Sequence, residues 1–233
     1  MHILMVESAL ELVPKRLWSH PTVASYAKRI GKDASWTILD GNYHHSAMRR
    51  LEDSEKRGRP DIVHMSLLVA QGSILNREGL LRTYVHTVND ELIEVDPTTR
   101  LPRNQERFKG VMAKVLSGAQ VKEDGEGKEL LKLTKGMTVK KILARLAPDK
   151  VYVLDDGKEV TTLSKVLKED GLPLEPGKKR DIVLIVGGFP HGDFSTDMSG
   201  FADRTFSVYK DTLELWTVLG VVIHDVERAL GLH

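Results

Sequence analysis

The chain has 233 residues, of which 41% are hydrophobic and 29% charged, so it can bury a sizeable core in one large α/β domain or in two small ones. Its 34 lysines and arginines nearly balance its 33 aspartates and glutamates, so any surface for nucleic acid must be a local patch. Cysteine is absent, which excludes disulfides, thiol catalysis and most structural zinc sites and is consistent with a cytoplasmic location.

The sequence does not indicate a membrane protein. Residues 1–13 lack a basic segment and contain Glu7 and Glu11, so we expect no signal peptide. The longest apolar run, Leu215 to Ile223, has nine residues and is too short to span a bilayer.

The first seventy residues predict two strands separated by helices. A short strand is expected over Ile3 to Val6, and a helix over Pro14 to Ile30 with a break near Pro21. Residues 43–57 predict a charged helix. The apolar run Ile62 to Ala70 predicts the second strand.

Arg59 and Asp61 flank a proline just before this second predicted strand. A residue that precedes proline avoids the helical region, so we expect Arg59 to be extended at the mouth of the strand. Asp61 is near enough in sequence to pair with Arg59. Two alternating runs then predict paired strands, Leu81 to Thr87 and Glu91 to Val95.

The next segment predicts a helix with a cationic stripe. Pro102 is well placed to begin this helix. At about 100° per residue, one side carries Arg103, Arg107, Gly110 and Lys114, and the other carries Phe108, Met112, Val115 and Leu116. Arg100 extends the stripe. Arginine binds phosphates through its planar fork, which favours contact with RNA or DNA; a solvated helix face is the alternative.

The middle of the chain alternates between predicted helices and strands. The expected elements are a linker or hairpin tip over Lys122 to Lys128, a helix over Thr138 to Leu146, a strand over Val151 to Leu154, a helix over Thr161 to Lys168 and a loop over Gly171 to Lys179. Such alternation predicts a largely parallel sheet.

A strand followed by a glycine-rich turn dominates the last quarter. Ile182 to Val186 is a run of branched apolar residues, typical of a strand buried on both faces. It is followed by a turn that contains Gly187, Gly188, Pro190 and Gly192. Ligands of open α/β sheets bind beyond the carboxyl ends of such strands, so the turn predicts a binding site, with an ordinary turn as the alternative.

Two known phosphate-binding patterns do not fit this turn. Gly187 and Gly192 have P-loop spacing, but Asp193-Phe194 follows where Lys-Ser/Thr is required. The glycines also miss the dinucleotide pattern G-x-G-x-x-G. The turn therefore favours a nucleoside-like ligand and disfavours a third class of function, a dinucleotide enzyme.

The last predicted helix, about Thr212 to Leu230, is apolar on two sides. One stripe contains Leu215, Leu219, Val222 and Val226, and the other contains Trp216, Ile223 and Leu230. The second stripe predicts a homodimer, although burial within one subunit explains it equally well. The histidines lack the spacing of a metal site, so we expect no metal.

Three segments together resemble one family: Arg59-Pro60-Asp61-Ile62-Val63-His64, Arg100-x-Pro102-Arg103-x-x-x-Arg107-Phe108-x-Gly110-Val111-Met112 and Val186-Gly187-Gly188-Phe189-Pro190-His191-Gly192. In sequence and order they are similar to the Nep/Emg family of the SPOUT superfamily, the pseudouridine N1-methyltransferases of small-subunit ribosome biogenesis. The resemblance covers the chain from about Met1 to its end and is closest to the short archaeal form.

The resemblance implies one SPOUT methyltransferase domain over residues 1–233. Its fold class would be α/β, a sheet with helices on both faces and a C-terminal trefoil knot over about 150–233. Family-specific insertions would lie at about 40–60 and 118–150, and a homodimer would form through the knotted region.

The implied activity is S-adenosylmethionine-dependent methylation of the N1 of a pseudouridine in small-subunit (16S) rRNA. The substrate would be a single-stranded hairpin loop, with the pre-ribosomal small-subunit particle as a partner. Arg59, Arg100, Arg103 and Arg107 would bind the RNA, and Asp61 would hold Arg59. The cofactor would be held by Leu154, Gly187, Gly192, Phe206, Ser207, Val208, Tyr209, Lys210 and Asp211.

Two points stay open. The family often has Leu-Ser-x-Tyr-Pro-Leu where this chain has Phe206 to Asp211, which leaves the contacts of that segment undefined. Methyl transfer depends mainly on placement, and the N1 proton requires an acceptor, for which Asp193 is a better candidate than Asp61. The alternative function is a non-catalytic dimeric rRNA-binding assembly factor.

Overall fold

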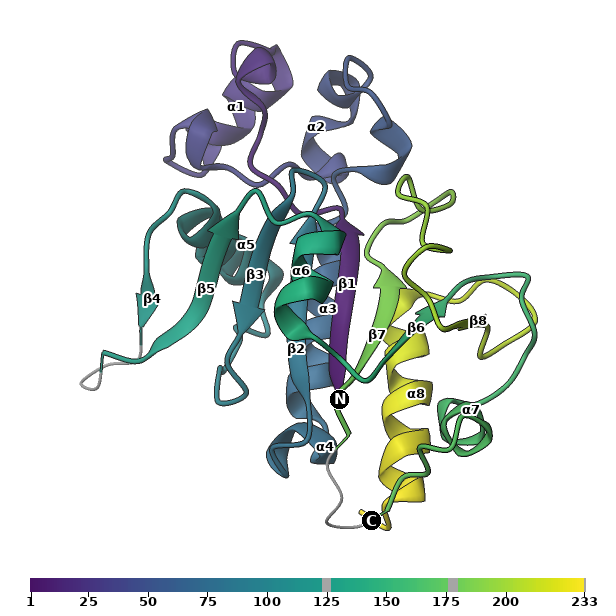
Figure 1. The fold of residues 1–233 in the computed structure, drawn as a ribbon. Helices are drawn as coiled ribbons and strands as arrows, with labels where there is room; N and C mark the ends of the chain where they lie inside the picture. Colours follow the sequence, from purple (N-terminus) through teal and green to yellow (C-terminus); the bar gives the residue numbers. More distant parts are fainter. Residues whose placement is uncertain (123–126, 176–179, 233) are drawn as a thin grey trace.

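A mixed sheet forms the centre of the computed structural model, which describes residues 1–122, 127–175 and 180–232 (Figure 1). Within these residues the sheet has eight strands in the order β4-β5-β3-β2-β1-β7-β6-β8. They are β1 (His2–Ser8), β2 (Arg82–Thr87), β3 (Glu91–Val95), β4 (Val121–Lys122), β5 (Glu129–Lys135), β6 (Lys150–Leu154), β7 (Ile182–Gly187) and β8 (Arg204–Phe206). From β2 to β8 the neighbouring strands are parallel, and β3, β5 and β4 extend the sheet in antiparallel fashion.

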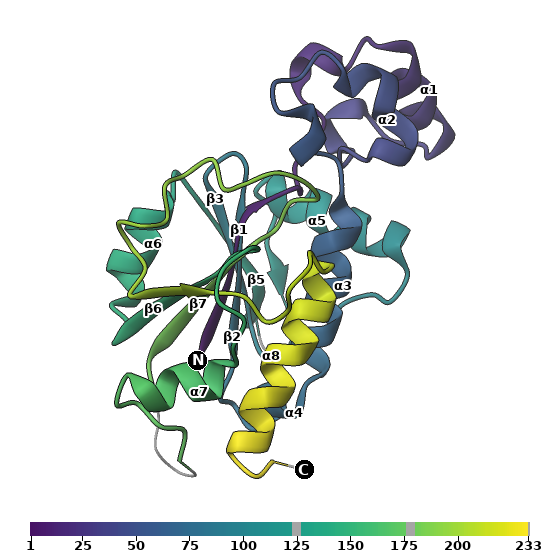
Figure 2. The ribbon, with the colours of Figure 1, turned by 90° about the vertical axis from the view of Figure 1, so that its right-hand side faces the viewer.

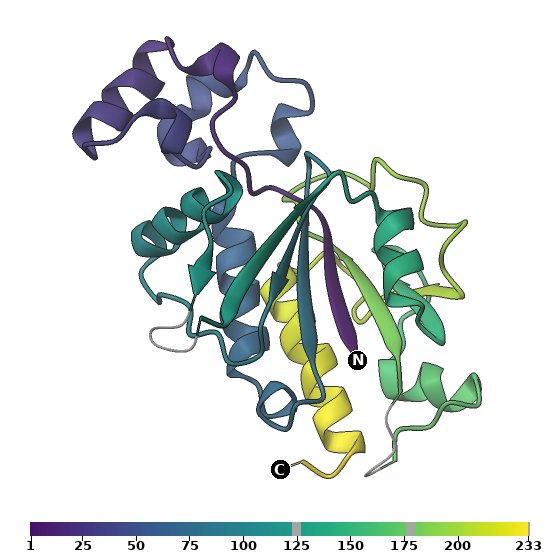
Figure 3. The same ribbon diagram turned by 60° about the vertical axis from the view of Figure 1, so that its left-hand side comes forward.

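Helices cover both faces of the sheet, which confirms the predicted α/β class (Figures 2 and 3). One face carries α3 (Pro60–Gly72), α4 (Ile74–Arg77), α5 (Gln105–Leu116), α7 (Leu163–Glu169) and α8 (Leu215–Ala229). The other face carries α6 (Val139–Leu146). Strand β1 supplies Ile3 and Met5 to the first core and Leu4 and Val6 to the second, because successive side chains alternate between faces.

A small helical lobe, which we define as residues 13–58, lies beyond the carboxyl end of β1 (Figures 1 and 2). It contains α1 (Pro21–Arg29), α2 (Gly41–Met48) and short 3₁₀ turns at Lys15–Leu17, Ala34–Trp36 and Ser54–Lys56. The lobe has its own core of Val13, Leu17, Val23, Leu39, Ala47, Met48 and Leu51. It connects β1 to the start of α3, so its position depends on both.

The prediction of a strand over Ile62 to Ala70 is wrong, because these residues lie in α3. Pro60 occupies the first helical turn together with Asp61, an arrangement that favours a helix start. The helix packs between the sheet and neighbouring helices, so several of its sides are buried and its apolar residues show no helical period. A continuous apolar run therefore could not distinguish this helix from a buried strand.

Several helix boundaries also differ from prediction. The helix expected over Pro14 to Ile30 starts at Pro21, where His20 accepts the backbone N–H of Thr22. The helix expected over 43–57 is α2, which ends at Met48. Helix α5 begins at Gln105 rather than Pro102, because the Asn104 side chain caps it by accepting the Arg107 N–H at 3.0 Å.

The other element predictions agree with the structure to within a few residues. Strands β2 and β3 form the expected antiparallel hairpin, and Thr138 and Thr162 cap α6 and α7. Val121–Lys122 pairs antiparallel with Glu129 and Leu131 as in a hairpin, but residues 123–126 lie outside the described residues, as do 176–179 of the loop predicted after Gly171. Within the described residues no helix combines the length and apolarity needed to cross a membrane.

Helix α8 buries the first of its two predicted apolar stripes. Leu219, Val222 and Val226 are at most 1% exposed. Ile223, from the second predicted stripe, is also buried against this core, while Trp216 and Leu230 are partly buried beside it. Packing within one subunit therefore explains part of the second apolar stripe, from which the sequence predicts a homodimer.

Candidate active site

A cavity of about 550 Å³ opens at the carboxyl ends of β6 and β7. Its walls come from the end of β6 and the turn after it (154–156), from the end of β7 and the turn after it (186–187 and 189–194), and from the segment that leads from β8 to the start of α8 (207–209 and 211–215). Ile62 and Val218 complete the lining. Ligands of parallel α/β sheets bind at this edge, and the volume is typical of a small-molecule site. The predicted strand and glycine turn thus form one wall of a real cavity.

The glycine turn is attached to the end of β1. Gly188 donates its N–H to the Val6 carbonyl at 2.8 Å and accepts the Ala9 N–H at 2.9 Å. A Cβ at Gly188 would lie 2.2 Å from Ser8 Oγ and 2.8 Å from Ser8 Cα, so no side chain fits there. Gly192 has φ +84°, a left-handed conformation that favours glycine. These two glycines are therefore required by the packing and conformation of the backbone in the turn.

The segment after β8 forms the facing wall. Ser207 donates its N–H to the Glu159 carbonyl at 2.9 Å, and its hydroxyl donates to the Tyr209 carbonyl at 2.6 Å. Of the predicted cofactor residues, the cavity is lined by Leu154, Gly187, Gly192, Ser207, Val208, Tyr209 and Asp211. Phe206 lies behind the wall with 1% exposure, and Lys210 points to solvent with its side chain 73% exposed. The structure thus brings together seven of these nine residues.

Carboxylates are concentrated around the cavity. Five of them line it: Asp155, Asp156, Asp193, Asp211 and Glu214. Among the described lining residues there is no lysine or arginine. Sequence reasoning identified Asp193 and Asp211 but missed the other three and Ile62. The position of Asp155 and Asp156 directly after a buried strand could have identified them.

Arg59 and Asp61 form the predicted pair at the start of α3. Arg59 Nε donates to Asp61 Oδ1 at 2.9 Å, and a terminal guanidinium nitrogen donates to Oδ2 at 2.8 Å. The hydrogen bonds from Arg59 to Asp61 raise the pKa of Arg59, and Glu214 at the cavity wall contributes in the same direction. Arg59 is thus held in one geometry, within electrostatic range of the cavity.

The other three predicted arginines lie on and just before α5. Arg100, Arg103 and Arg107 are exposed and make no ion pair within the part of the chain that the structure describes. Their segment is held by His64 of α3, whose Nε2 donates to the Pro102 carbonyl at 2.7 Å. Free guanidinium groups can bind phosphates without first losing an internal partner.

Helix α3 connects the arginines to the cavity. Its residue Ile62 lines the cavity, and His64 both bonds the Pro102 carbonyl and stacks on Phe108 with ring centroids 4.3 Å apart. Arg59 precedes the first turn of the same helix. The two predicted sites therefore share the first two turns of α3, a relation that the wrong strand prediction for this segment hid.

The lobe contributes a further cation to the stripe. The Cβ position of Gly110 lies 3.6 Å from Lys32 Nζ, so this gap in the stripe is occupied by a lysine from the lobe. Lys32 follows α1 and is more than seventy residues from α5 in sequence, and helical periodicity could not have shown this contact.

A buried lysine docks the lobe on α5. Lys109 is 5% exposed and donates from Nζ to Asp40 Oδ2 and to Glu106 Oε1, both at 2.7 Å. Its ammonium group lies 4.8 Å from the centroid of the Tyr43 ring. Burial alone would lower the pKa of Lys109, but the hydrogen bonds to Asp40 and Glu106 outweigh this effect and raise it. Lys109 therefore stays charged in the docked lobe.

Relatives of this sequence match it over nearly its whole length. The EMG1/NEP1 methyltransferase family model matches residues 3–227. The chain belongs to this family. It is 45% identical over 227 residues to the ribosomal RNA small subunit methyltransferase Nep1 of Pyrococcus furiosus, covering 97% of this chain and 96% of the relative. It is 41% identical over 235 residues to the protein of the same name from Thermococcus kodakarensis, covering 100% of both.

A solved structure of an EMG1/NEP1 relative shares the fold. The crystal structure of Archaeoglobus fulgidus Nep1 bound to S-adenosylhomocysteine superposes with a TM-score of 0.82 at 32% identity, covering 100% of this chain and 99% of that one. The family resemblance of the three sequence segments is thereby confirmed, together with the mixed α/β architecture.

Proposed function

We propose that this chain is an S-adenosylmethionine-dependent methyltransferase that acts on small-subunit rRNA and modifies the N1 of a pseudouridine. The observation that carries the proposal is the cavity at the ends of β6 and β7 in a chain that matches, over its full length, a Nep1 bound to S-adenosylhomocysteine. The family's activity supplies the reaction class, and the residues of this chain supply the site.

The cavity suits this cofactor in size and charge. Its volume of about 550 Å³ accommodates a nucleoside-sized ligand. The five carboxylates of its lining would repel phosphates but attract the positive charges of a sulfonium and an amino group. When bound, the cofactor supplies an electrophilic methyl group. Leu154, Gly187, Gly192, Ser207, Val208, Tyr209 and Asp211 would hold it.

The arginines bind the RNA beside the cavity. Arg100, Arg103 and Arg107 contact phosphates, and Arg59, oriented by Asp61, contacts the RNA nearest the cavity. A base must leave its stack to reach a buried reagent, so a single-stranded hairpin loop is the substrate that fits. Lys32 lies beside the stripe and would add to its positive field.

Asp193 is the proposed acceptor of the N1 proton. It lines the cavity, and within the described residues its carboxylate accepts no hydrogen bond, so both oxygens are free to accept a proton. Asp61 is occupied by Arg59. We expect Asp193→Asn to lower the single-turnover rate at saturating substrate by about 10²-fold or more. A full rate in this variant would exclude Asp193 as the base.

The decisive experiment is mass spectrometry of an rRNA hairpin incubated with the protein and isotope-labelled S-adenosylmethionine. A labelled methyl group on pseudouridine, and none on a hairpin with uridine at that position, is the expected result. Calorimetry with S-adenosylhomocysteine separates the alternative function, since a non-catalytic assembly factor would bind RNA but not this ligand.

The proposal extends to the assembly and topology of the protein. Near the cavity, Asp155 donates its N–H to the Phe206 carbonyl and Thr161 donates to the Ser207 carbonyl, so the chain at 206–207 bonds both ends of the 155–161 loop. The proposal includes a trefoil knot over about 150–233, the region to which these hydrogen bonds belong. Partly exposed Trp216 and Leu230 support a homodimer, which sedimentation velocity would detect. An rRNA substrate fits a pre-ribosomal small-subunit particle in the cytoplasm.

A further inference from the structure

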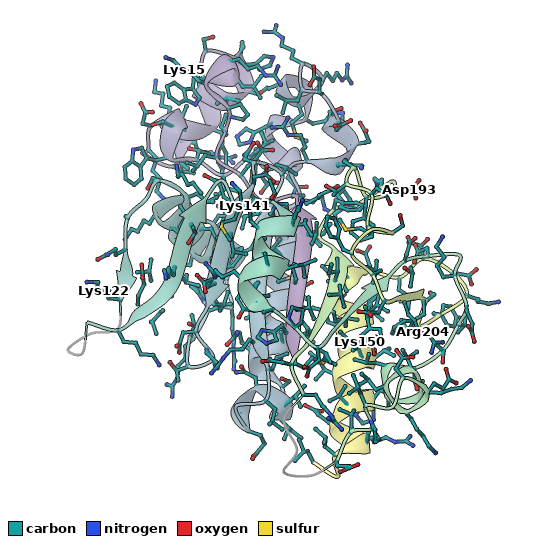
Figure 4. The ribbon with its side chains drawn as sticks, in the orientation of Figure 1. Lys15, Lys122, Lys141, Lys150, Asp193 and Arg204 are labelled. Atoms are coloured by element: carbon teal, nitrogen blue, oxygen red, sulfur yellow. The ribbon has the colours of Figure 1, made fainter. Side chains whose placement is uncertain are left out.

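The helical lobe reaches the glycine turn through the side chain of Lys56. Its Nζ donates to the Asp193 carbonyl and, at 2.9 Å, to Ser195 Oγ. The ammonium group also lies 5.0 Å from the centroid of the Phe189 ring, and the side chain is 15% exposed. All three contacts fall on the loop that presents Gly192 and Asp193 to the cavity. Figure 4 shows Asp193 in this loop, next to the lower edge of the lobe.

The loop has few other attachments at this point. Gly188 fastens its start to β1 through two backbone hydrogen bonds. Within the described part of the chain, the backbone from Phe189 to Phe194 makes no further hydrogen bond apart from the one that Lys56 donates. The middle of the loop therefore depends on a side chain from a different part of the fold.

Glu7 holds the far end of the same loop. Its carboxylate accepts the N–H of Ser195 on one oxygen and the N–H of Thr196 on the other, both at 2.8 Å. The carboxylate also lies 4.0 Å from Lys56 Nζ. Glu7 has φ +52°, where β1 loses its regular pairing with β2, a left-handed conformation that costs about 1 kcal/mol for a residue other than glycine. Strained residues of this kind persist where their surroundings require the geometry.

We propose that Lys56 and Glu7 are positioning residues for the methyl donor: together they fix residues 189–196 so that Gly192 and Asp193 face the cavity in the binding geometry. Neither residue lies in the predicted cofactor set, and Lys56 belongs to the lobe rather than to the sheet. The inference rests on the proposed cofactor site. It makes the lobe a part of that site as well as a neighbour of the arginine stripe.

The test compares Lys56→Ala with a matched surface variant, Lys15→Ala, from the same lobe. Lys15 is exposed and lies on the upper side of the lobe in Figure 4, away from Asp193. By calorimetry, we expect Lys56→Ala to raise the Kd for S-adenosylhomocysteine about tenfold, because charge-assisted hydrogen bonds that order the loop are lost. The Kd of Lys15→Ala should equal that of the wild type.

Two further measurements separate positioning from general damage to the fold. Amide hydrogen exchange without ligand should be faster at residues 191–195 in Lys56→Ala but unchanged in the sheet. With the RNA hairpin, kcat/KM for the methyl donor should fall about tenfold or more, because the loop carries Asp193 as well as Gly192, while KM for the hairpin should stay unchanged. Lys56→Arg, which keeps a charged donor, should recover most of the affinity.

Ser195→Ala and Glu7→Gln test the loop contacts without removing the lysine. Each should raise the Kd for S-adenosylhomocysteine about threefold or more. If Lys56→Ala and Glu7→Gln both bind the ligand as tightly as the wild type, the positioning role is wrong. If Lys56→Ala is unstable, Glu7→Gln and Ser195→Ala decide the question, because they leave the lobe intact: normal binding by both overturns the positioning role.

A cavity variant distinguishes failure of this inference from failure of the proposed function. Val208→Trp would fill the cavity at a lining residue. If the wild type binds no S-adenosylhomocysteine, or Val208→Trp binds it normally, the cofactor site itself is wrongly assigned. If Val208→Trp loses binding and the Lys56 and Glu7 variants do not, the cofactor site stands and the positioning role alone is overturned.

Discussion

Single residues carry much of the geometry at the cavity. Gly188 was singled out in the sequence as part of a glycine cluster, and its actual constraint is Ser8, which leaves no space for a Cβ. Gly192 is required for another reason, its left-handed backbone. Glu7 adopts a similar conformation despite its side chain and directs its carboxylate to the loop. Gly188, Gly192 and Glu7 thus each constrain the shape of the loop over residues 189–196.

Gly188→Ala should destabilise the protein and displace the loop. A Cβ would lie 2.8 Å from the backbone Cα of Ser8, so strand β1 or the loop must shift. We expect a loss of about 1–3 kcal/mol in the free energy of unfolding, measured by denaturant titration. Gly200→Ala is the control, because a Cβ there meets no atom within 4 Å. Equal stability of the two variants would contradict this account.

His44 should make the protein sensitive to mild acid. Burial lowers its pKa to about 4, with Asp40 opposing this shift and Lys109 adding to it. The unfolded chain therefore binds a proton below about pH 6.5 that the folded chain binds only near pH 4, so stability falls as the pH decreases through this range. The limiting slope for this residue is about 1.4 kcal/mol per pH unit.

The matched variant for this prediction is His44→Asn. Its amide oxygen can accept the Asp40 N–H that His44 Nδ1 accepts at 3.0 Å, and it does not titrate. Urea titrations between pH 4 and pH 7 should show a smaller decrease in stability for the variant than for the wild type. Parallel pH profiles of the two proteins would rule out His44 as the cause.

At the scale of elements, α3 and α5 organise the two halves of the site. Helix α5 buries Phe108 and Met112 and exposes its arginines, as its periodicity predicts. Helix α3 contacts α5 through His64 and the cavity through Ile62. The arginine stripe and the cavity are therefore neighbours because each packs on the same helix.

Charge reversal in the stripe should weaken RNA binding and its dependence on salt. For Arg103→Glu we expect a lower affinity for the rRNA hairpin and a slope of log Kd against log salt that is smaller by about one or more, because a phosphate contact is lost. S-adenosylhomocysteine binding should be unchanged. Lys140→Glu, the same charge change on exposed α6 across the sheet, is the control. An unaltered slope for Arg103→Glu would count against the stripe as an RNA surface.

At the scale of the whole molecule, charged side chains attach the lobe to the α/β unit at several places. Lys109 of α5 joins it through Asp40, and Lys56 of the lobe joins the cavity loop. Arg57 adds a pair with Glu11, with oxygens 2.7 Å from Nε and 2.5 Å from a terminal nitrogen. Each attachment uses a largely buried charged side chain, so removing one partner should destabilise the docking of the lobe.

Lys109→Met should loosen the lobe without unfolding the sheet. Asp40 is 2% exposed and would lose its cationic partner, and the uncompensated buried charge should cost about 3–5 kcal/mol. Amide hydrogen exchange should show faster exchange in residues 13–58 than in β1 and β7. Lys114→Met changes an exposed lysine of the same helix and should leave both regions unaffected. Uniform acceleration over the whole chain would show that the lobe does not open independently.

By itself, the sequence determined the features that depend on neighbouring residues. A run of branched apolar residues identified β7, the helical period separated the arginines of α5 from its buried face, and the glycine turn marked the edge of the sheet where the cavity lies. The three motifs identified the family. Backbone periodicity and turn chemistry are local properties, so they can be read along the chain.

The tertiary structure alone decided that Ile62 to Ala70 is a helix, that Ser8 excludes a side chain at Gly188, and that Lys56 and Glu7 hold the cavity loop. The contact between Lys56 and Ser195 joins residues 139 positions apart. Such a contact depends on the order of the strands in the sheet and on where the lobe docks. Neither of these can be read from the local sequence.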